Sequence, residues 1–513
     1  MKCKSKTKQF RWFVTVYLLV IAMVMPASTW AQKTITPVKP QGTGSAEAPY
    51  QITNAAELYW FAALVNGTLP DGKQSLYCQA ILMNDIVVNE HLVESIQTDA
   101  NGNVTNGDSF ISWTPIGVFD KNANFMGTFD GQNFTISGLY CNKPTGDYVG
   151  FFGVLGRMRE ENPGIVKNLG IIDSYFNGTN YVGSISGRSR GGTITNCYNT
   201  SPVNGKEYVG GICGAGDKDL INDEVTRFSK CLNVGSVNGQ KFVGGICGWD
   251  NYGEINNCYN HGNIDINQKY FSETEKNFFG GVCGYKWSGA VTNCYSICSV
   301  SGGAYVGGVC GSNSLGSITG CYHKGKVTGG NYSGGVCGKK DTNEKTIITG
   351  CYYDNTLCKK KGIGNETGSE DVAGCATGKS LSELEAKTLC EKFGNHPFEH
   401  EGFCAICDEY EPARVVSETH HPELAGEYSG YYAIENAGQL YWFSKKKSSY
   451  NVVLVNDITV NKNVLDENGN LAGDGSNFRT WEPIDYDPHG YLSTFDGRQH
   501  TIRGLYVNAL VSG

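Results

Sequence analysis

Tyr208-Val-Gly-Gly-Ile-Cys-Gly214 is a stretch that recurs along this chain with few substitutions. The first residue of every copy is aromatic, and most copies keep the glycines in place. The seven copies begin at Tyr148, Tyr181, Tyr208, Phe242, Phe278, Tyr305 and Tyr332. Their spacings are 33, 27, 34, 36, 27 and 27 residues, so the base period is 27 with insertions in three repeats. Self-similarity at such a period is typical of proteins built from stacked repeats.

A second landmark lies inside most repeats. It reads Ile255-Asn-Asn-Cys-Tyr-Asn260 in one repeat and recurs from Ile194, Val291, Ile318 and Ile348. Each repeat therefore holds two or three short runs of β-branched, aromatic and small residues separated by glycine, which favours strands. A unit this small cannot bury its apolar face alone, so its neighbours must stack on it. We predict an all-β fold in which residues 148–358 form a right-handed parallel β-helix of about seven coils. A β-propeller is the alternative, although its blades need about 40 residues.

The overall composition agrees with a strand-rich fold. Glycine accounts for 68 of 513 residues, about 13%, against about 7% in average proteins. The formal net charge is −8, and no long basic run follows the first residues. Because binding to a phosphate backbone needs clustered Lys and Arg, we expect no nucleic-acid partner.

The N-terminal residues 1–31 have the pattern of a cleaved signal peptide. A positive segment that includes Lys2 and Arg11 precedes an apolar stretch from Trp12 to Met25, and Thr29 and Ala31 supply the small residues before the cleavage point. The apolar stretch is short for a transmembrane helix, although a short membrane anchor is the alternative. We therefore expect an exported chain, secreted or at the cell surface, with no integral membrane segment after signal removal.

Two further blocks are duplicates of each other. Ile52–Phe61 matches Ile434–Phe443, and Thr128–Tyr140 matches Thr494–Tyr506. In both copies an amphipathic helix should begin at a capping box, formed by Asn54 with Glu57 and by Asn436 with Gln439. Such a helix would cover the open end of a solenoid. We predict that 32–147 is an N-terminal cap of one helix and strands, and that 426–513 is the duplicate cap of a second, truncated solenoid.

The stretch between these units, 359–425, is predicted to be a linker with a short helix after Ser380 and a compact Cys/His segment. Within that segment the side chains of His396, His400, Cys404 and Cys407 could supply four zinc ligands. The alternative is a disulfide or a pair of reduced thiols.

A candidate calcium site occurs once in each duplicated block. Oxygen-bearing side chains alternate at Asp99, Asn101 and Asn103, and again at Asp466, Asn468 and Asn470. Such a set suits calcium, yet Val104 and Leu471 stand where an EF-type loop needs glycine. The Asn-Gly pair alone would explain a tight turn. No cofactor is required by the sequence, and zinc and calcium are its two candidates.

The repeats resemble the GLUG-motif repeats of bacterial exported and surface, adhesin-like proteins. The motif is carried by Gly210–Gly214, Gly244–Gly248, Gly280–Gly284, Gly307–Gly311 and Gly334–Gly338. The resemblance covers about residues 148–358 and implies a repeat architecture without fixing a function. Some relatives are zinc peptidases with a His-Glu-x-x-His motif, which this chain lacks. Gly187-Arg-Ser189-Arg-Gly191 matches a nucleophile elbow in letters only, and we interpret it as a turn between strands.

We therefore expect a non-enzymatic secreted or cell-surface protein that acts as an adhesin-like binding or scaffolding module. Its ligand would be a protein or a glycan on the side face of the solenoid. The alternative is the non-catalytic part of a larger exported enzyme, a peptidase or a polysaccharide-degrading enzyme, with its catalytic domain beyond residue 513. One tyrosine recurs in each coil: Tyr198, Tyr259, Tyr295, Tyr322 and Tyr352. These side chains either point outward and form an aromatic ladder or point inward and belong to the core. We favour the core.

Cysteines recur at two places in the coils. The first set is Cys213, Cys247, Cys283, Cys310 and Cys337, and the second is Cys197, Cys231, Cys258, Cys294, Cys321 and Cys351. Equal spacing in stacked coils places equivalent cysteines about 4.8 Å apart, within disulfide range. Neighbouring side chains in a parallel ladder point the same way, however, so we predict two ladders of buried free thiols.

Overall fold

The computed structural model describes residues 33–118, 123–156, 163–218, 224–267, 276–364, 376–379, 402–403, 409–418, 420–445, 450–461, 464–465, 470–472, 475, 478–481 and 493–507. The predicted signal peptide, the helix after Ser380 and the Cys/His segment from His396 to Cys407 lie outside these residues, apart from 402–403. No helix in the described ranges is long and apolar enough to cross a membrane.

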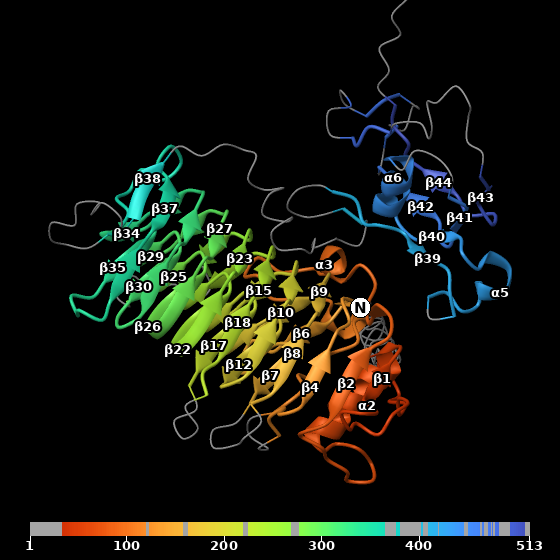
Figure 1. Cartoon of the computed structure of the whole chain (residues 1–513), viewed down its shortest axis with the longest axis horizontal. Helices are drawn as coiled ribbons and strands as arrows, with labels where there is room; N and C mark the ends of the chain where they lie inside the picture. Colours follow the sequence, from red (N-terminus) through yellow and green to blue (C-terminus); the bar gives the residue numbers. More distant parts are fainter. Residues whose placement is uncertain are drawn as a thin grey trace, which may run out of the picture.

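Short strands wind into a column of parallel sheets that rises from the red end to the cyan end of Figure 1. Two narrow sheets contain one strand from each coil. One has β6 (Tyr140–Asn142), β10 (Tyr175–Asn177), β15 (Val203–Asn204), β20 (Val237–Gly239), β24 (Ile264–Ile266), β28 (Val300–Ser301) and β33 (Val327–Thr328). The other has β11 (Asn180–Gly183), β16 (Glu207–Gly210), β21 (Lys241–Gly244), β25 (Phe278–Gly280), β29 (Tyr305–Gly307) and β34 (Tyr332–Gly334).

A third sheet runs almost the whole length of the column. Its strands are β3 (Ile86–Val87), β5 (Thr135–Ser137), β9 (Gly170–Ile172), β14 (Tyr198–Asn199), β19 (Leu232–Asn233), β23 (Tyr259–Asn260), β27 (Tyr295–Ser296), β32 (Tyr322–His323), β37 (Cys351–Asp354) and β38 (Ala376–Lys379).

The fourth and largest sheet has two arms that join at two ten-residue strands, β22 (Cys247–Asn256) and β26 (Cys283–Thr292). One arm contains β1 (Tyr50–Ile52), β2 (Gln79–Leu82), β4 (Thr128–Asp130), β8 (Ile165–Lys167), β13 (Thr193–Thr195), β18 (Arg227–Ser229), β31 (Ser317–Thr319) and β36 (Ile347–Thr349). The other contains β7 (Phe152–Leu155), β12 (Ser186–Arg190), β17 (Cys213–Asp217), β30 (Cys310–Asn313) and β35 (Cys337–Lys340). Every strand pair in these four sheets is parallel, so the predicted all-β parallel β-helix is confirmed.

The repeat motif sets the register from coil to coil. Cys283 pairs with Cys310 and Cys310 with Cys337, as the 27-residue period requires. A longer repeat leaves the pairing unchanged, because Cys213 still pairs with Cys247. The conserved spacing of the motif, rather than the total repeat length, therefore aligns the coils.

The interior of the column is filled by the β-branched residues of the motif. The inward positions next to the motif glycines have no exposed surface at Val182, Ile185, Val209, Ile212, Val243, Ile246, Val282, Val306, Val309 and Val336. The glycine at the tight turn before each cysteine strand has a steric role. A Cβ added to Gly210 would lie 2.0 Å from the carbonyl oxygen of Cys213, so only glycine fits this turn.

Helix α2 (Ala55–Asn66) lies at the red end of the column, as predicted for a lid. The Oδ1 of Asn54 accepts the backbone N–H of Glu57 at 3.1 Å. The Glu57 carboxylate reaches back to the N–H of Thr53 at 2.7 Å, one residue before the N-cap. The apolar face of the helix buries Leu58, Phe61 and Val65 completely. The described part of this block also contains the short helices α3 (Leu92–Ser95) and η1 (Gly107–Ser109).

Two predicted boundaries of the solenoid differ from the observed ones. Strand pairing crosses residue 148, because β4 pairs with β8 and β5 with β9. The sheets therefore begin at Tyr50, inside the block interpreted as a separate cap. At the other end β38 pairs with β37, so the column extends into the predicted linker. The strand pairing extends further along the chain than the similarity to the repeat motif. A flanking strand needs only to match the register of the neighbouring coil, and it does not need the motif itself.

The second unit repeats the start of the first. It contains β39 (Arg414–Val415), α5 (Ala425–Tyr428), β40 (Tyr432–Ile434), α6 (Ala437–Lys445), β41 (Val452–Leu454), β42 (Ile458–Thr459), β43 (Phe495–Asp496) and β44 (Ile502–Arg503). Parallel pairing of β40, β41 and β43 corresponds to that of β1, β2 and β4.

The two units also share side-chain contacts at equivalent positions. Tyr59 and Trp113 cross edge-to-face at 5.2 Å, and their counterparts Tyr441 and Trp481 do so at 5.1 Å. The second unit starts earlier than the predicted boundary at residue 426. Residues 403, 413, 416 and 424, which we assigned to the linker, belong to its buried clusters.

Candidate binding face

Seven aromatic rings form a continuous stack along one side of the solenoid. They are the opening residues of the seven repeats, and we call them the aromatic ladder: Tyr148, Tyr181, Tyr208, Phe242, Phe278, Tyr305 and Tyr332. Ring centroids of successive members lie 4.9, 4.6, 5.0, 5.2, 4.9 and 4.7 Å apart. Interplanar angles range from 2° to 23°, so each ring lies face-to-face with the next. All seven are half-buried.

The register of the six-stranded sheet builds this ladder. Phe278 pairs with Tyr305 and Tyr305 with Tyr332, and parallel strands are about 4.8 Å apart. The side chain of the next residue points inward, so that Val209 and Val243 have no exposed surface while Tyr208 and Phe242 reach the surface. Face-to-face stacking covers the faces of the inner rings, and the ladder presents ring edges and phenol hydroxyls to solvent.

The middle of the ladder is widened by three rings from the neighbouring sheet, which we call the aromatic platform: Trp249, Tyr285 and Trp287. Tyr285 crosses both Phe242 and Phe278 at 69°, with centroids 5.6 and 5.0 Å away. Trp249 crosses Tyr208 at 70°. Trp287 is 40% exposed and lies 6.4 Å from Tyr285. Exposed tryptophan beside a stacked ridge makes this the most aromatic part of the described side face.

Charged and polar groups flank the two aromatic features. The Arg188 guanidinium lies 4.9 Å from the ring centre of Tyr181 and 2.6 Å from the carboxylate of Asp217. The Tyr285 hydroxyl lies 2.9 Å from Ser314 Oγ, which in turn donates to Asp341. Burial raises the pKa of Tyr285, so its hydroxyl stays protonated at neutral pH. The face can therefore offer aromatic contact together with fixed hydrogen-bonding groups.

The tyrosines that we considered for a ladder lie elsewhere, in the ten-stranded sheet. Tyr198 and Tyr322 are buried, with 6% and 7% exposure, whereas Tyr352 is 38% exposed. Tyr198 packs with Ile172 and Leu232 in a satellite cluster outside the main core. Two of the five side chains are thus buried, but none of the five belongs to the main core of the column. The actual ladder could have been found from the aromatic residue that opens each repeat, because in five of the seven repeats an inward valine follows it.

The first copy of the candidate calcium site is a tight turn, which is the alternative that we considered for it. Asp99 Oδ1 accepts the backbone N–H groups of Asn101 and Asn103, both at 2.8 Å. Asp99 Oδ2 accepts the side-chain amide of Asn103 at 2.9 Å. The three residues thus form a hydrogen-bonded turn, and calcium binding there stays a prediction. In the second copy Asn470 is described, while Asp466 and Asn468 lie outside the described residues.

The candidate zinc ligands His396, His400, Cys404 and Cys407 all lie outside the described residues, and zinc binding by them stays a prediction. Ser189, by contrast, is described, and our interpretation of its segment as a turn is wrong. It lies within β12, which continues to Arg190, and it has no exposed surface. No substrate could reach its hydroxyl.

Both predicted cysteine ladders are present in the described residues. All fifteen described cysteines are free and buried. Members of the first set pair in register, and each thiol donates to the carbonyl two residues ahead, as Cys247 does to Trp249 at 3.2 Å. Burial raises the pKa of Cys283 and Cys310 well above the usual value for a thiol. The ladders therefore serve the core and leave the side face to the aromatic rings.

Comparisons with known proteins find sequence similarity over about a third of the chain. No family model matches it. It is 30% identical over 179 residues to "Halomucin" of Haloquadratum walsbyi, which is 34% of this chain and 2% of that protein. It is 28% identical over 183 residues to a "Putative Gly-rich membrane protein" of Evansella cellulosilytica, which is 35% of this chain and 18% of that protein. The chain thus spans a small part of either relative.

Among solved structures, a crystal structure of a "putative immunoglobulin A1 protease" from Bacteroides ovatus matches 69% of this chain and 91% of that chain. The TM-score is 0.43 and the sequence identity is 18%.

Proposed function

We propose that this chain is a non-enzymatic, exported or cell-surface binding protein of the GLUG-repeat type, and that its aromatic platform binds an extended glycan. The observation that carries the proposal is the continuous aromatic surface formed by the ladder and the platform. The names of the two sequence relatives, a mucin and a membrane protein, support a surface setting.

The geometry of the rings favours the platform over the ladder as the contact point. The apolar C–H face of a sugar ring packs against an aromatic face, whereas the inner ladder rings have their faces covered. Trp287 is exposed, and it lies on the coil next to that of Tyr252, whose ring is also exposed. Large rigid aromatic side chains supply contact area at low entropic cost.

The polar groups beside the platform suit recognition of a hydroxyl-rich ligand. Ser314, Asp341 and Lys339 are linked, because Lys339 Nζ lies 2.9 Å from the Asp341 carboxylate. An ion-paired carboxylate is held in place as a hydrogen-bond acceptor. Trp249 and Tyr285 are register partners in neighbouring coils, so an extended ligand could contact both.

The test is affinity electrophoresis of the full chain through gels that contain soluble polysaccharides of different backbone and charge. We expect at least one to retard the wild-type chain, and Trp287→Ala to abolish the retardation. Tyr352→Ala is the matched control, because Tyr352 is 38% exposed, close to the 40% of Trp287, but lies on a different sheet. Equal retardation of the wild type and Trp287→Ala would contradict the proposal.

A further inference from the structure

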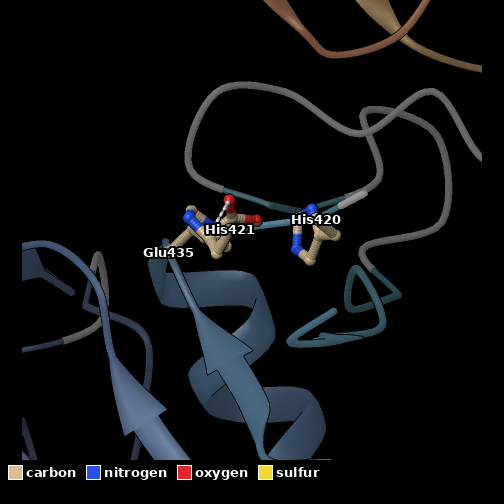
Figure 2. A group of neighbouring side chains, drawn as sticks. All are labelled: His420, His421 and Glu435. Carbon is tan, nitrogen blue, oxygen red and sulfur yellow. Dashed lines mark hydrogen bonds and ion pairs between the residues drawn. The ribbon is translucent and has the colours of Figure 1, made fainter. Parts of the chain in front are cut away.

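Two histidines and a glutamate converge in the second unit, on residues that the sequence patterns did not single out. His420, His421 and Glu435 each offer one ligand atom, and these atoms lie within 4.8 Å of one another. Among the described residues this is the one such group of His, Cys, Asp and Glu. Figure 2 shows the Glu435 carboxylate against the His421 ring, with the His420 ring beside them.

The duplication shows that Glu435 is not needed to start the helix. In the first copy Thr53 occupies this position, and the Glu57 carboxylate accepts the Thr53 N–H. In the second copy Gln439 replaces Glu57, and its Oε1 accepts the Glu435 N–H at 2.7 Å. The same capping geometry is thus made by a neutral amide. The negative charge has moved from the helix to residue 435, one position before the N-cap.

Gln439 also holds the displaced charge in place. Its Nε2 donates to Glu435 Oε2 at 3.1 Å, which leaves Oε1 directed at His421. A glutamate at position 439 would repel this carboxylate. The two substitutions relative to the first copy therefore belong together, and both favour a carboxylate that faces the histidines.

The two histidines have the environment of metal ligands. His421 Nε2 lies 2.8 Å from Glu435 Oε1, and His421 Nδ1 lies 2.9 Å from Glu423 Oε1. A carboxylate on the second ring nitrogen is the usual way in which a metal-binding imidazole is oriented. His420 Nε2 has no exposed surface and no hydrogen-bond partner. A buried polar atom normally has a partner, and a bound cation would be the partner of this ring nitrogen.

We propose that His420, His421 and Glu435 bind a zinc ion, with Glu423 as the positioning residue of His421. Two imidazoles and one carboxylate form a donor set that zinc accepts, with the fourth position left to water. The ion would join His420 and His421 to the point where β40 leads into α6. This site is separate from the glycan-binding face and from the candidate Cys/His segment.

The experiment uses the full chain in a background of Cys404→Ser and Cys407→Ser, which disables the other candidate zinc site. Zinc is removed by a chelator, and binding is measured by competition with a chromophoric indicator. We expect one tight equivalent of zinc, which is lost in His420→Ala. Glu423→Gln should weaken binding by about 10–100-fold, as loss of an orienting partner does. His500→Ala, in the same unit and paired with Asp457, is the matched control.

A reversion variant protects this test against misfolding. Glu435→Thr with Gln439→Glu restores the pair that builds the same helix start in the first copy, so it should fold and yet bind no zinc. The absorption of cobalt(II) substituted for zinc should report nitrogen and oxygen ligands and disappear in the same variant. An unchanged zinc stoichiometry in both His420→Ala and the reversion variant would overturn the proposal, and so would the absence of any tight equivalent in the parent chain.

Discussion

The ammonium of Lys286 lies against the carboxylate of Asp250 in the interior of the solenoid, and neither side chain has any exposed surface. The two residues are register partners on β26 and β22, one coil apart. Lys286 also donates to the carbonyl of Gly253, and the Gly253 N–H donates to Asp250 at 3.1 Å. Ser189 and Asn313 occupy corresponding positions in other coils, so the pair belongs to a buried polar column.

Loss of one partner of this ion pair should cost more than loss of both. Asp250→Ala leaves a buried ammonium unpaired. We expect this variant to lose about 3–5 kcal/mol of the free energy of unfolding. Asp250→Val with Lys286→Met replaces the pair by apolar groups and should restore a large part of the loss. Urea unfolding of the three chains measures the difference. A double variant as unstable as Asp250→Ala would contradict the assignment.

The sequence predicts the coils well because the information is repeated. A motif that recurs at 27 residues specifies the register once per coil, and Cys283, Cys310 and Cys337 accordingly lie in line. The buried ion pair could not be predicted in this way. Asp250 and Lys286 each occur in a single repeat, and a charged residue in a strand is usually assigned to the outside. Their inward direction follows from the register that they share with Ser189 and Asn313 in other coils.

The candidate zinc site was missed for a related reason. His420 and His421 are separated from Glu435 by a turn, a short helix and a strand, and no standard ligand spacing connects them. A signal was nevertheless present in the duplicated blocks. Thr53 and Glu57 of the first block correspond to Glu435 and Gln439 of the second, so the negative charge changes position between two similar helix starts.

A buried histidine should make the solenoid sensitive to acid. His323 continues the column in which Asn199, Asn233 and Asn260 hydrogen-bond from coil to coil. Its Nε2 lies 3.2 Å from the Gly325 carbonyl, and burial lowers the pKa of His323 from 6.5 to about 4. Between these values the unfolded chain binds the proton and the folded chain does not. The stability contributed by neutral His323 is therefore complete above pH 6.5 and is lost as the pH falls towards 4.

The expected loss over this interval is about 3 kcal/mol, because each pKa unit corresponds to about 1.4 kcal/mol. His323→Asn places in this coil the residue that the earlier coils use, and it should remove this part of the pH dependence. Urea unfolding at pH 7.5 and at pH 4.5 gives the comparison. If the variant loses as much stability in acid as the wild type, His323 is not the titrating group.

The cysteine ladders should remain reduced even in an oxidising compartment, where cysteines are usually paired. Cys247, Cys283 and Cys310 each donate to a carbonyl two residues ahead, at 3.2, 3.4 and 3.2 Å. The thiols are thus directed along their own strands, and burial keeps them protonated. Alkylation of the native chain without reductant should modify few of the fifteen described cysteines, and alkylation after unfolding should modify all of them. Unfolded chains that resist alkylation until reductant is added would indicate disulfides.

The last prediction compares equivalent phenylalanines of the duplicated blocks. Phe129 lies 5.8 Å from Phe61 of the lid helix, and Phe495 lies 5.9 Å from the corresponding Phe443. Phe129 is also covered by the next coil, where Phe151 lies 5.1 Å away, and it has no exposed surface. Phe495 is half-buried.

Truncation of Phe129 to alanine should therefore leave a closed cavity and cost about 3–5 kcal/mol, whereas Phe495→Ala removes a ring that is partly hydrated already and should cost about half as much. Hydrogen exchange with urea, read separately for peptides of the two units, measures both losses. Equal losses would mean that the lid helix alone determines the burial of the ring. A larger loss for Phe129 would show that a following coil, as well as the helix, closes the core.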